Sequence, residues 1–339
     1  MTVPGEGIGW DTVGAVVRGG GHYLALGWHY EPSPPIGYNG GPRLWASTDG
    51  VAWERIGVPT GLESLGQAVS LVATPTGEFL LFGNSYDDAA NVLRPIALRS
   101  ADGLSWEAIP VELPSGLHVT RVVSGPKGYL LAGRDDGPGG LWLSADGIAW
   151  RSVHELTPSD TRYEDITDIG AGDDGFVAVG IAGVPSGESA AFALASSDGV
   201  TWIRSDDPFP TDERHAGTAL VAPMGGDWVA TIGWTGASTR FWQSANGLQW
   251  QQAGIIDGAP PINPVLASAG SQLFYSNTAT EVPVGQAGGW TSADGVTWTP
   301  VDLGLDGVLA GAYEDDRGLI LVGAVVVSDD RADAAFWRP

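Results

Sequence analysis

One seven-residue pattern, S-x-D-G-x-x-W, occurs six times in this chain of 339 residues and constrains its fold more than any other feature. The copies begin at Ser47, Ser100, Ser144, Ser196, Ser244 and Ser292. Successive tryptophans of the pattern are separated by 53, 44, 52, 48 and 48 residues. A repeat of about this length is typical of units with four antiparallel strands. We therefore predict an all-β chain built from such units.

The motif has a local explanation as a tight hairpin that joins two strands. The Asp carboxylate can accept hydrogen bonds from backbone N–H groups of its own turn, and Gly supplies the positive φ that the reversal needs. Trp begins the return strand and covers the turn with a large apolar surface. Asn246 replaces Asp in the fifth copy, which keeps the turn-capping oxygen without its charge. We therefore expect the six Asp/Asn residues to be structural and not catalytic.

The strands around the motif are clearest in the fourth repeat. Predicted strands there cover 166–169, 176–180, 192–195 and 201–203, with a polar turn at 173–175. The second strand, which is apolar and usually ends in Gly, occurs seven times against six motifs: at 23–27, 79–83, 129–133, 176–180, 228–233, 273–276 and 319–323. The seventh repeat, 308–337, supplies three strands and lacks the fourth.

An open edge on the last repeat would invite pairing with other chains, and residues 2–8 are the natural donor of the missing strand. We therefore predict a seven-bladed β-propeller of four-stranded antiparallel blades, closed by the N-terminal strand. The prediction treats 1–339 as a single domain. Its blades lie at approximately 11–58, 67–112, 119–156, 166–206, 217–256, 264–302, and 307–339 plus 1–9.

The repeat resembles the Asp-box, or BNR, repeat of sialidase-like propellers, whose usual form is S-x-D-x-G-x-x-W. Every copy here lacks one residue between Asp and Gly. The resemblance covers nearly the whole chain and implies the fold, with the motifs on the face opposite the active site. Sialidase chemistry would also need several arginines, a Tyr nucleophile and a Glu partner. The family's early Arg-Ile-Pro motif is missing, and Leu93-Arg94-Pro95-Ile96 is only a scrambled likeness.

Composition narrows the range of partners. The formal net charge is −24, and Lys127 is the only lysine beside 15 arginines, so phosphate backbones and anionic membranes would be repelled. We expect no nucleic acid partner, no membrane insertion and a monomer; a salt-adapted or high-GC source would equally explain the acidity.

Cysteine is absent, which excludes disulfides and thiolate chemistry. The start has no signal-peptide pattern. Either the protein is cytoplasmic or a leader has been removed, and the resemblance favours a secreted or cell-surface protein.

Longer loops on the face opposite the motifs are expected to carry the function. They cover 28–42, 83–94, 134–140, 157–165, 206–215, 234–239 and 277–288. Three tryptophans outside the motif and the strands fall toward this face: Trp10, Trp28 and Trp234. His29 and Tyr30 directly follow Trp28 in the sequence. These rings could stack on sugars. Alternatively, they cover the proline-rich loop of the first repeat.

Charged residues on the same face suggest a second group. Alignment of the repeats on their second strands places His118 beside Asp165, and Arg121 beside Asp168, in neighbouring blades. Such a group could serve acid/base chemistry or cation binding. It could equally be an ion-pair network without a catalytic role. We take His118, Asp165 and Glu164 as candidate catalytic residues, and Arg121, Asp168 and His215 as candidate ligand-binding residues together with the aromatic group and His29.

No linear metal motif is present. A calcium site at Asp135–Asp136 or Asp206–Asp207 remains possible, but neither has the oxygen spacing of a dedicated calcium loop. Two functions are open. The first is a binding or interaction module for a carbohydrate or a partner protein. The alternative is a glycan-acting hydrolase or lyase that uses the same face.

Overall fold

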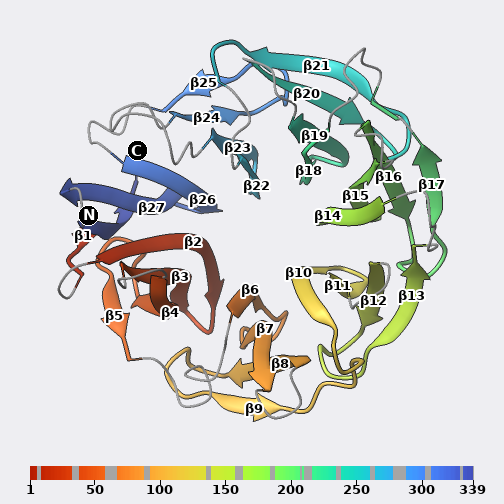
Figure 1. Cartoon of the computed structure of the whole chain (residues 1–339). Coiled ribbons are helices and arrows are strands. Elements are labelled where there is room, and N and C mark those ends of the chain that lie inside the picture. Colours follow the sequence, from red (N-terminus) through yellow and green to blue (C-terminus); the bar gives the residue numbers. More distant parts are fainter. Residues whose placement is uncertain are drawn as a thin grey trace.

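The computed structural model describes residues 1–5, 9–32, 38–57, 67–87, 92–134, 139–156, 163–183, 188–206, 208–209, 216–233, 238–259, 264–277, 288–301, 307–328 and 331–338. The regular secondary structure of these residues is β-strand throughout. No helix among them is long and apolar enough to cross a membrane. The sheets stand around a central axis like the blades of a propeller (Figure 1). The predicted all-β architecture of four-stranded antiparallel sheets is therefore confirmed.

Five sheets have four strands each, which follow one another in chain order from the centre outward. The first comprises β6 (Gln67–Ala73), β7 (Phe79–Asp87), β8 (Val92–Ser100) and β9 (Glu107–Ile109), and the second β10 (His118–Gly125), β11 (Gly128–Arg134), β12 (Gly140–Ser144) and β13 (Arg151–Glu155). The third comprises β14 (Tyr163–Gly172), β15 (Gly175–Gly183), β16 (Ser189–Ser196) and β17 (Ile203–Asp206), and the fourth β18 (Thr218–Met224), β19 (Asp227–Gly233), β20 (Thr239–Ser244) and β21 (Gln251–Ile256). The fifth comprises β22 (Pro264–Ala269), β23 (Gln272–Asn277), β24 (Gly288–Ser292) and β25 (Thr299–Pro300).

The remaining strands form one eight-stranded sheet that joins the two ends of the chain. It comprises β26 (Gly307–Asp315), β27 (Gly318–Ser328), β28 (Arg331–Trp337), β1 (Thr2–Val3), β2 (Gly9–Gly19), β3 (His22–Pro32), β4 (Tyr38–Ser47) and β5 (Glu54–Ile56). The strand β1 pairs with β28, as predicted, with Thr2 opposite Ala335. A short parallel pairing of β2 with β28 was not predicted, and it places Trp10 beside Ala332.

The six motif hairpins have one geometry. In the hairpin that begins at Ser144, the Ser hydroxyl donates to Asp146 Oδ1 at 3.0 Å and accepts the N–H of Gly147 at 2.8 Å. Asp146 Oδ1 also accepts the N–H groups of Ile148 and Ala149. The motif glycines all have φ between 67° and 78°, a left-handed conformation. Each carboxylate is thus committed to its own turn, which agrees with the structural role predicted from the sequence.

The hydrogen bonds from the N–H groups of Thr201 and Val200 lower the pKa of Asp198 to about 2. A carboxyl whose folded-state pKa is lowered stabilises the fold above its unfolded pKa, near 3.8, and loses that effect as the pH falls through about 2. Asp198→Asn should preserve the hairpin at pH 7, because Asn246 shows that an amide oxygen accepts the same bonds, and should lower the melting temperature only by the part that depends on the charge.

Thermal unfolding of Asp198→Asn between about pH 4 and pH 2 should show a smaller acid-induced loss of melting temperature than the wild type. The reciprocal control, Asn246→Asp, should enlarge that loss. Equal acid profiles for all three proteins would contradict the assignment of these carboxylates to turn stabilisation.

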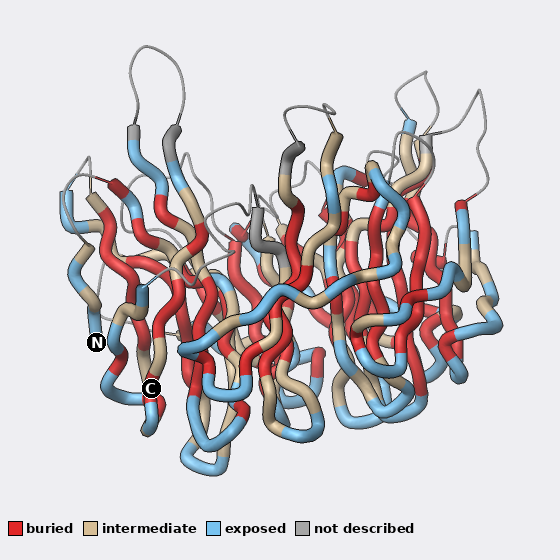
Figure 2. The backbone as a smooth tube through the Cα atoms, turned by 90° about the horizontal axis from the view of Figure 1, so that it is seen from below, coloured by how far each residue is buried: buried red, intermediate tan, exposed pale blue. Residues whose placement is uncertain are grey.

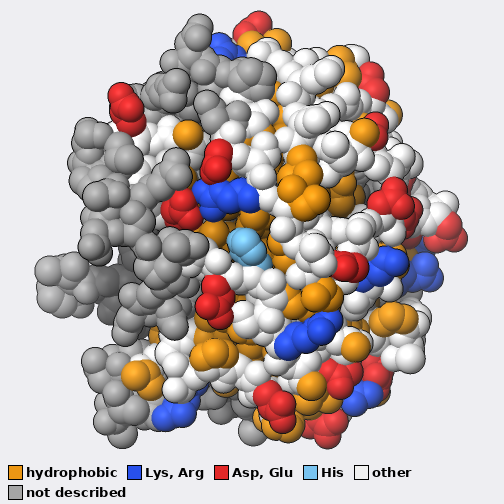
Figure 3. Space-filling view, turned by 90° about the vertical axis from the view of Figure 1, so that its right-hand side faces the viewer, with side chains coloured by type: hydrophobic (Ala, Val, Ile, Leu, Met, Phe, Trp, Pro, Cys, Tyr) orange, Lys and Arg blue, Asp and Glu red, His pale blue; other side chains and the backbone are white. Residues whose placement is uncertain are grey.

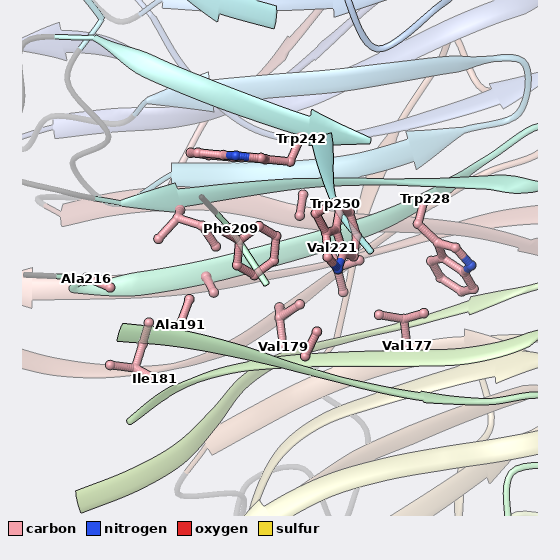
Figure 4. Packing of buried hydrophobic residues seen from close by; sticks show 14 of the residues in the cluster. Val177, Val179, Ile181, Ala191, Phe209, Ala216, Val221, Trp228, Trp242 and Trp250 are labelled. Carbon is pink, nitrogen blue, oxygen red and sulfur yellow. The ribbon is translucent and has the colours of Figure 1, made fainter. Parts of the chain in front are cut away.

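Apolar side chains fill the spaces between neighbouring sheets. Figure 4 shows one such layer, in which Val177 and Val179 of β15 face Val221 of β18. Phe209 packs there against Trp242 and Trp250, with ring centroids 5.7 and 5.1 Å apart. Each sheet therefore depends on both neighbouring sheets for its core. Burial of the apolar surface between sheets is the main contribution to the stability of the fold.

Candidate functional site at the loop rim

The antiparallel order of the strands defines two rims. The motif hairpins join third to fourth strands, so they share a rim with the turns that join first to second strands; we call it the turn rim. Figure 2 shows short exposed turns along this lower rim. The opposite rim, which we call the loop rim, contains the start of each inner strand, including His118 of β10 and Glu164 and Asp165 of β14.

Arg121 and Asp168 form an ion pair between two neighbouring inner strands, as predicted. Arg121 Nε lies 2.9 Å from Asp168 Oδ1, and the carboxylate is 2% exposed while the guanidinium side chain is 48% exposed. Asp168 Oδ2 accepts the N–H of Val221 on β18. Burial raises the pKa of Asp168, against the opposing effect of Arg121. Asp168 thus connects three sheets and holds a half-exposed guanidinium at the centre of the ring.

Similar polar links occur between other sheets. Ser70 Oγ accepts the N–H of Val122 at 2.9 Å, and Thr167 Oγ1 donates to the carbonyl of Ala219 at 2.7 Å. These contacts favour a structural role for Asp168. Arg121 differs from its counterparts in other inner strands. The equivalent positions, directly after the bulges of β2, β6 and β26, hold small residues: Ala15, Ser70 and Gly311.

The second predicted pair contains an additional residue. Arg134 Nη1 donates to Asp165 Oδ2 at 3.0 Å, so the carboxylate that was predicted beside His118 also pairs with an arginine. His118 lies opposite Arg134 across the β10–β11 ladder. Burial lowers the pKa of His118 below its ordinary value of 6.5, Arg134 lowers it further, and Asp165 raises it. The imidazole is therefore neutral at pH 7, between a cation and a carboxylate.

Glu164 is placed away from this group. Consecutive residues of a strand leave opposite faces of the sheet, so Glu164 and Asp165 diverge. Both oxygens of Glu164 accept hydrogen bonds from Arg204 of β17, at 3.0 and 3.1 Å. Arg204 also lies 4.2 Å above the ring of Phe192 and binds Asp206. The face over β13 and β17 shows mixed acidic, basic and apolar side chains around a histidine (Figure 3).

The aromatic group of the first repeat is split. Trp10 and Tyr30 are 41% and 43% exposed, and the rings of Trp28 and Tyr30 lie 6.1 Å apart. His29 is buried instead, with Nδ1 2.7 Å from Oδ1 of the buried Asp11 and Nε2 3.3 Å from Glu31 Oε1. The imidazole is thus anchored in the interior by a carboxylate that the sequence reasoning missed.

Several expectations lie outside the described residues: His215, Trp234, Asp207 and the Asp135–Asp136 pair. Among the residues that the structure describes, no group of three His, Asp or Glu side chains is arranged to hold a metal ion. Sequence reasoning also missed Arg134 and Arg204 as partners of the candidate carboxylates. A usable signal for Arg134 was its position directly after the second strand of its repeat, at the start of a loop.

No family model matches the chain, and no curated protein matches it. Among solved structures, the α-L-arabinanase of Penicillium chrysogenum complexed with arabinobiose is similar, with a TM-score of 0.53 at 14% identity over 98% of both chains. The α-L-arabinofuranosidase of Fusarium graminearum with an iminosugar inhibitor gives 0.54 at 13% identity, covering 80% of this chain and 93% of that one. Trypanosoma rangeli sialidase with the inhibitor DANA gives 0.52 at 10% identity, over 97% of this chain and 55% of that one. At such identities the likeness establishes a β-propeller fold.

Proposed function

We propose that the protein cleaves glycosidic bonds at the loop rim of the β10–β13 and β14–β17 sheets. The observation that carries this proposal is the meeting there of a neutral imidazole, a carboxylate and a half-exposed guanidinium, those of His118, Asp165 and Arg134. The Arg121–Asp168 ion pair lies further along the same two inner strands. The solved structures compared above are an arabinofuranosidase, an arabinanase and a sialidase, which supports cleavage over binding alone.

We also propose that the fold has seven blades. We count the eight-stranded sheet as two blades, β26-β27-β28-β1 and β2-β3-β4-β5, joined by the short β2–β28 pairing. With the five four-stranded sheets this gives seven blades. We also infer that the six hairpins are Asp-boxes shortened by one residue, which places the proposed site on the rim opposite to them.

The proposed roles follow from charge and exposure. Hydrolysis needs a proton donor at the glycosidic oxygen, a base that takes a proton from the attacking water, and a negative group near the developing positive charge of the sugar ring. His118, whose pKa is lowered, is suited to accept the proton of the attacking water and to pass it to the leaving glycosidic oxygen, and Asp165 is suited to stabilise positive charge. The guanidinium of Arg121 can bind sugar hydroxyls with several N–H donors. Because the protein carries a net charge of −24, a neutral glycan is the favoured substrate.

Purified protein should release reducing ends from one member of a panel of neutral polysaccharides, with sialosides and polygalacturonate as anionic comparisons. On the substrate that is turned over, His118→Ala should reduce kcat/KM by about 10²–10⁴-fold. The matched control is His22→Ala, which changes an exposed histidine on the turn rim. The acid limb of the wild-type pH profile should lie below pH 6.5, since protonation of His118 abolishes its role as a base. Equal rates for His118→Ala and wild type would refute the assignment.

A binding-only function is the second candidate, and the exposed rings of Trp10 and Tyr30 favour it. In that case calorimetry should detect a glycan that no preparation cleaves. The double variant Trp10→Ala with Tyr30→Ala should then lose that binding, while His118→Ala should retain it.

A further inference from the structure

The sheet β18–β21 carries an unusual concentration of uncharged amides. Four of the seven glutamines in the chain lie between 243 and 252, and residues 241–256 contain no charged side chain. The only motif copy with Asn in place of Asp, at Asn246, lies in the same stretch. In a chain with a net charge of −24, this is a locally neutral and strongly hydrogen-bonding surface.

These amides line a groove of about 390 Å³ on the turn rim. The groove lies beside the hairpin of β20 and β21 and reaches the next motif hairpin along the ring. Its lining includes Gln243, Asn246, Gln249, Gln251, Gln252 and Val296. Asp227 adds a carboxylate at its edge.

The fold uses only part of this hydrogen-bonding capacity. Asn246 Oδ1 accepts the N–H groups of Leu248 and Gln249 at 2.9 and 3.0 Å, as the Asp carboxylates do in other copies. Its amide nitrogen is an additional donor that a carboxylate would not provide. Gln243 Nε2 donates to the carbonyl of Asp294 and so connects this hairpin to the next sheet. The side chains of Gln249, Gln251 and Gln252 belong to exposed residues.

We propose that this amide groove binds a neutral oligosaccharide. Each amide offers donors and an acceptor without charge, which matches the alternating donor and acceptor character of sugar hydroxyls. Val296, which is 44% exposed, adds an apolar surface for the C–H face of a sugar ring. A carboxylate-bearing glycan would meet Asp227 and the net negative charge of the protein, so the groove favours neutral ligands.

The amide groove is separated from the proposed cleavage site, because it lies on the turn rim and His118 lies on the loop rim. It would therefore hold a glycan without acting on it. Binding there does not require the proposed function to be correct, and the two can be tested apart.

Isothermal titration should use neutral hexasaccharides of arabinose, xylose and glucose, with hexagalacturonate as the anionic comparison, on the His118→Ala protein so that no probe is consumed. At least one neutral probe should bind, and the anionic probe should not. Gln249→Ala and Gln251→Ala should each weaken binding by about 2- to 12-fold, the range for one lost hydrogen bond. Asn246→Asp should also weaken binding while preserving the hairpin.

Arg151→Ala is the matched control, because it changes an exposed residue at the position that follows the motif Trp in another sheet. It should leave the affinity unchanged, and all variants should melt at the wild-type temperature. The proposal is overturned if no neutral probe binds at millimolar concentration, if the anionic probe binds as well as the neutral ones, or if Gln249→Ala and Gln251→Ala bind like Arg151→Ala. Weaker binding in Gln249→Ala and Gln251→Ala, measured in the His118→Ala protein, would support the amide groove independently of the loop-rim site.

Discussion

Removal of residues 1–5 should lower the melting temperature by about 5–10 °C, because several kcal/mol of stabilisation disappear from a domain of this size. Two backbone hydrogen bonds join Met1, which precedes β1, to Phe336 of β28. The N-terminal ammonium donates to the carbonyl of Phe336, and the N–H of Phe336 donates to the carbonyl of Met1. Gly5 N–H donates to Asp333 Oδ1 at 3.0 Å. Val3 packs on the core cluster that contains Trp53 and Phe336.

Truncation should also leave β28 as an open edge that favours association between molecules. Differential scanning calorimetry measures the first effect and size-exclusion chromatography the second. A synthetic peptide of residues 1–8, added in trans, should restore part of the lost stability by strand addition, whereas a scrambled peptide should not. An unchanged melting curve after truncation would show that the ring is held closed without β1.

Gly27→Ala should prevent folding or lower the free energy of unfolding by about 3 kcal/mol or more, at the upper end of overpacking costs. A Cβ atom on this residue of β3 would lie 1.8 Å from the carbonyl oxygen of Thr12 and 2.8 Å from the ring of Trp45. The clash is with backbone, and β3 is paired to β2 and β4, so it cannot move aside. Gly323 of β27 has the same relation to Val308, also at 1.8 Å.

Urea denaturation measures this effect. Gly14→Ala provides the control, because Gly14 lies at the nearby bulge of β2 and a Cβ there would meet no atom within 4 Å. It should change the unfolding free energy by no more than about 0.5 kcal/mol. Similar denaturation midpoints for the two variants would mean that β2 can yield at Thr12.

The sequence was sufficient wherever a feature depends on neighbouring residues. The motif hairpins are an example, because Ser144, Asp146 and Gly147 form their bonds within four residues. Counting strands against motifs also predicted the pairing of β1 with β28. The closing glycine of the second strand was visible as a pattern. Its cause, the close carbonyl of Thr12, required coordinates.

The candidate site was harder to predict from the sequence, because ion pairs between sheets depend on strand register and on bulges. Alignment of the repeats correctly predicted that Arg121 pairs with Asp168, because each residue lies directly after the bulge of its inner strand. It missed Arg134, which lies on the second strand and reaches Asp165 across the gap between sheets. Arg204 was missed for a similar reason, since a fourth-strand residue has no fixed position relative to Glu164 on the first strand.

The pairing of Met1 with Phe336 and of Thr2 with Ala335 places the two chain ends side by side at one end of an antiparallel ladder (Figure 1). A force applied between these ends would load the hydrogen bonds one after another and not all at once. Mechanical extension of the molecule should therefore begin with the unzipping of β1 at low force. The rest of the ring would resist until the first and last sheets separate.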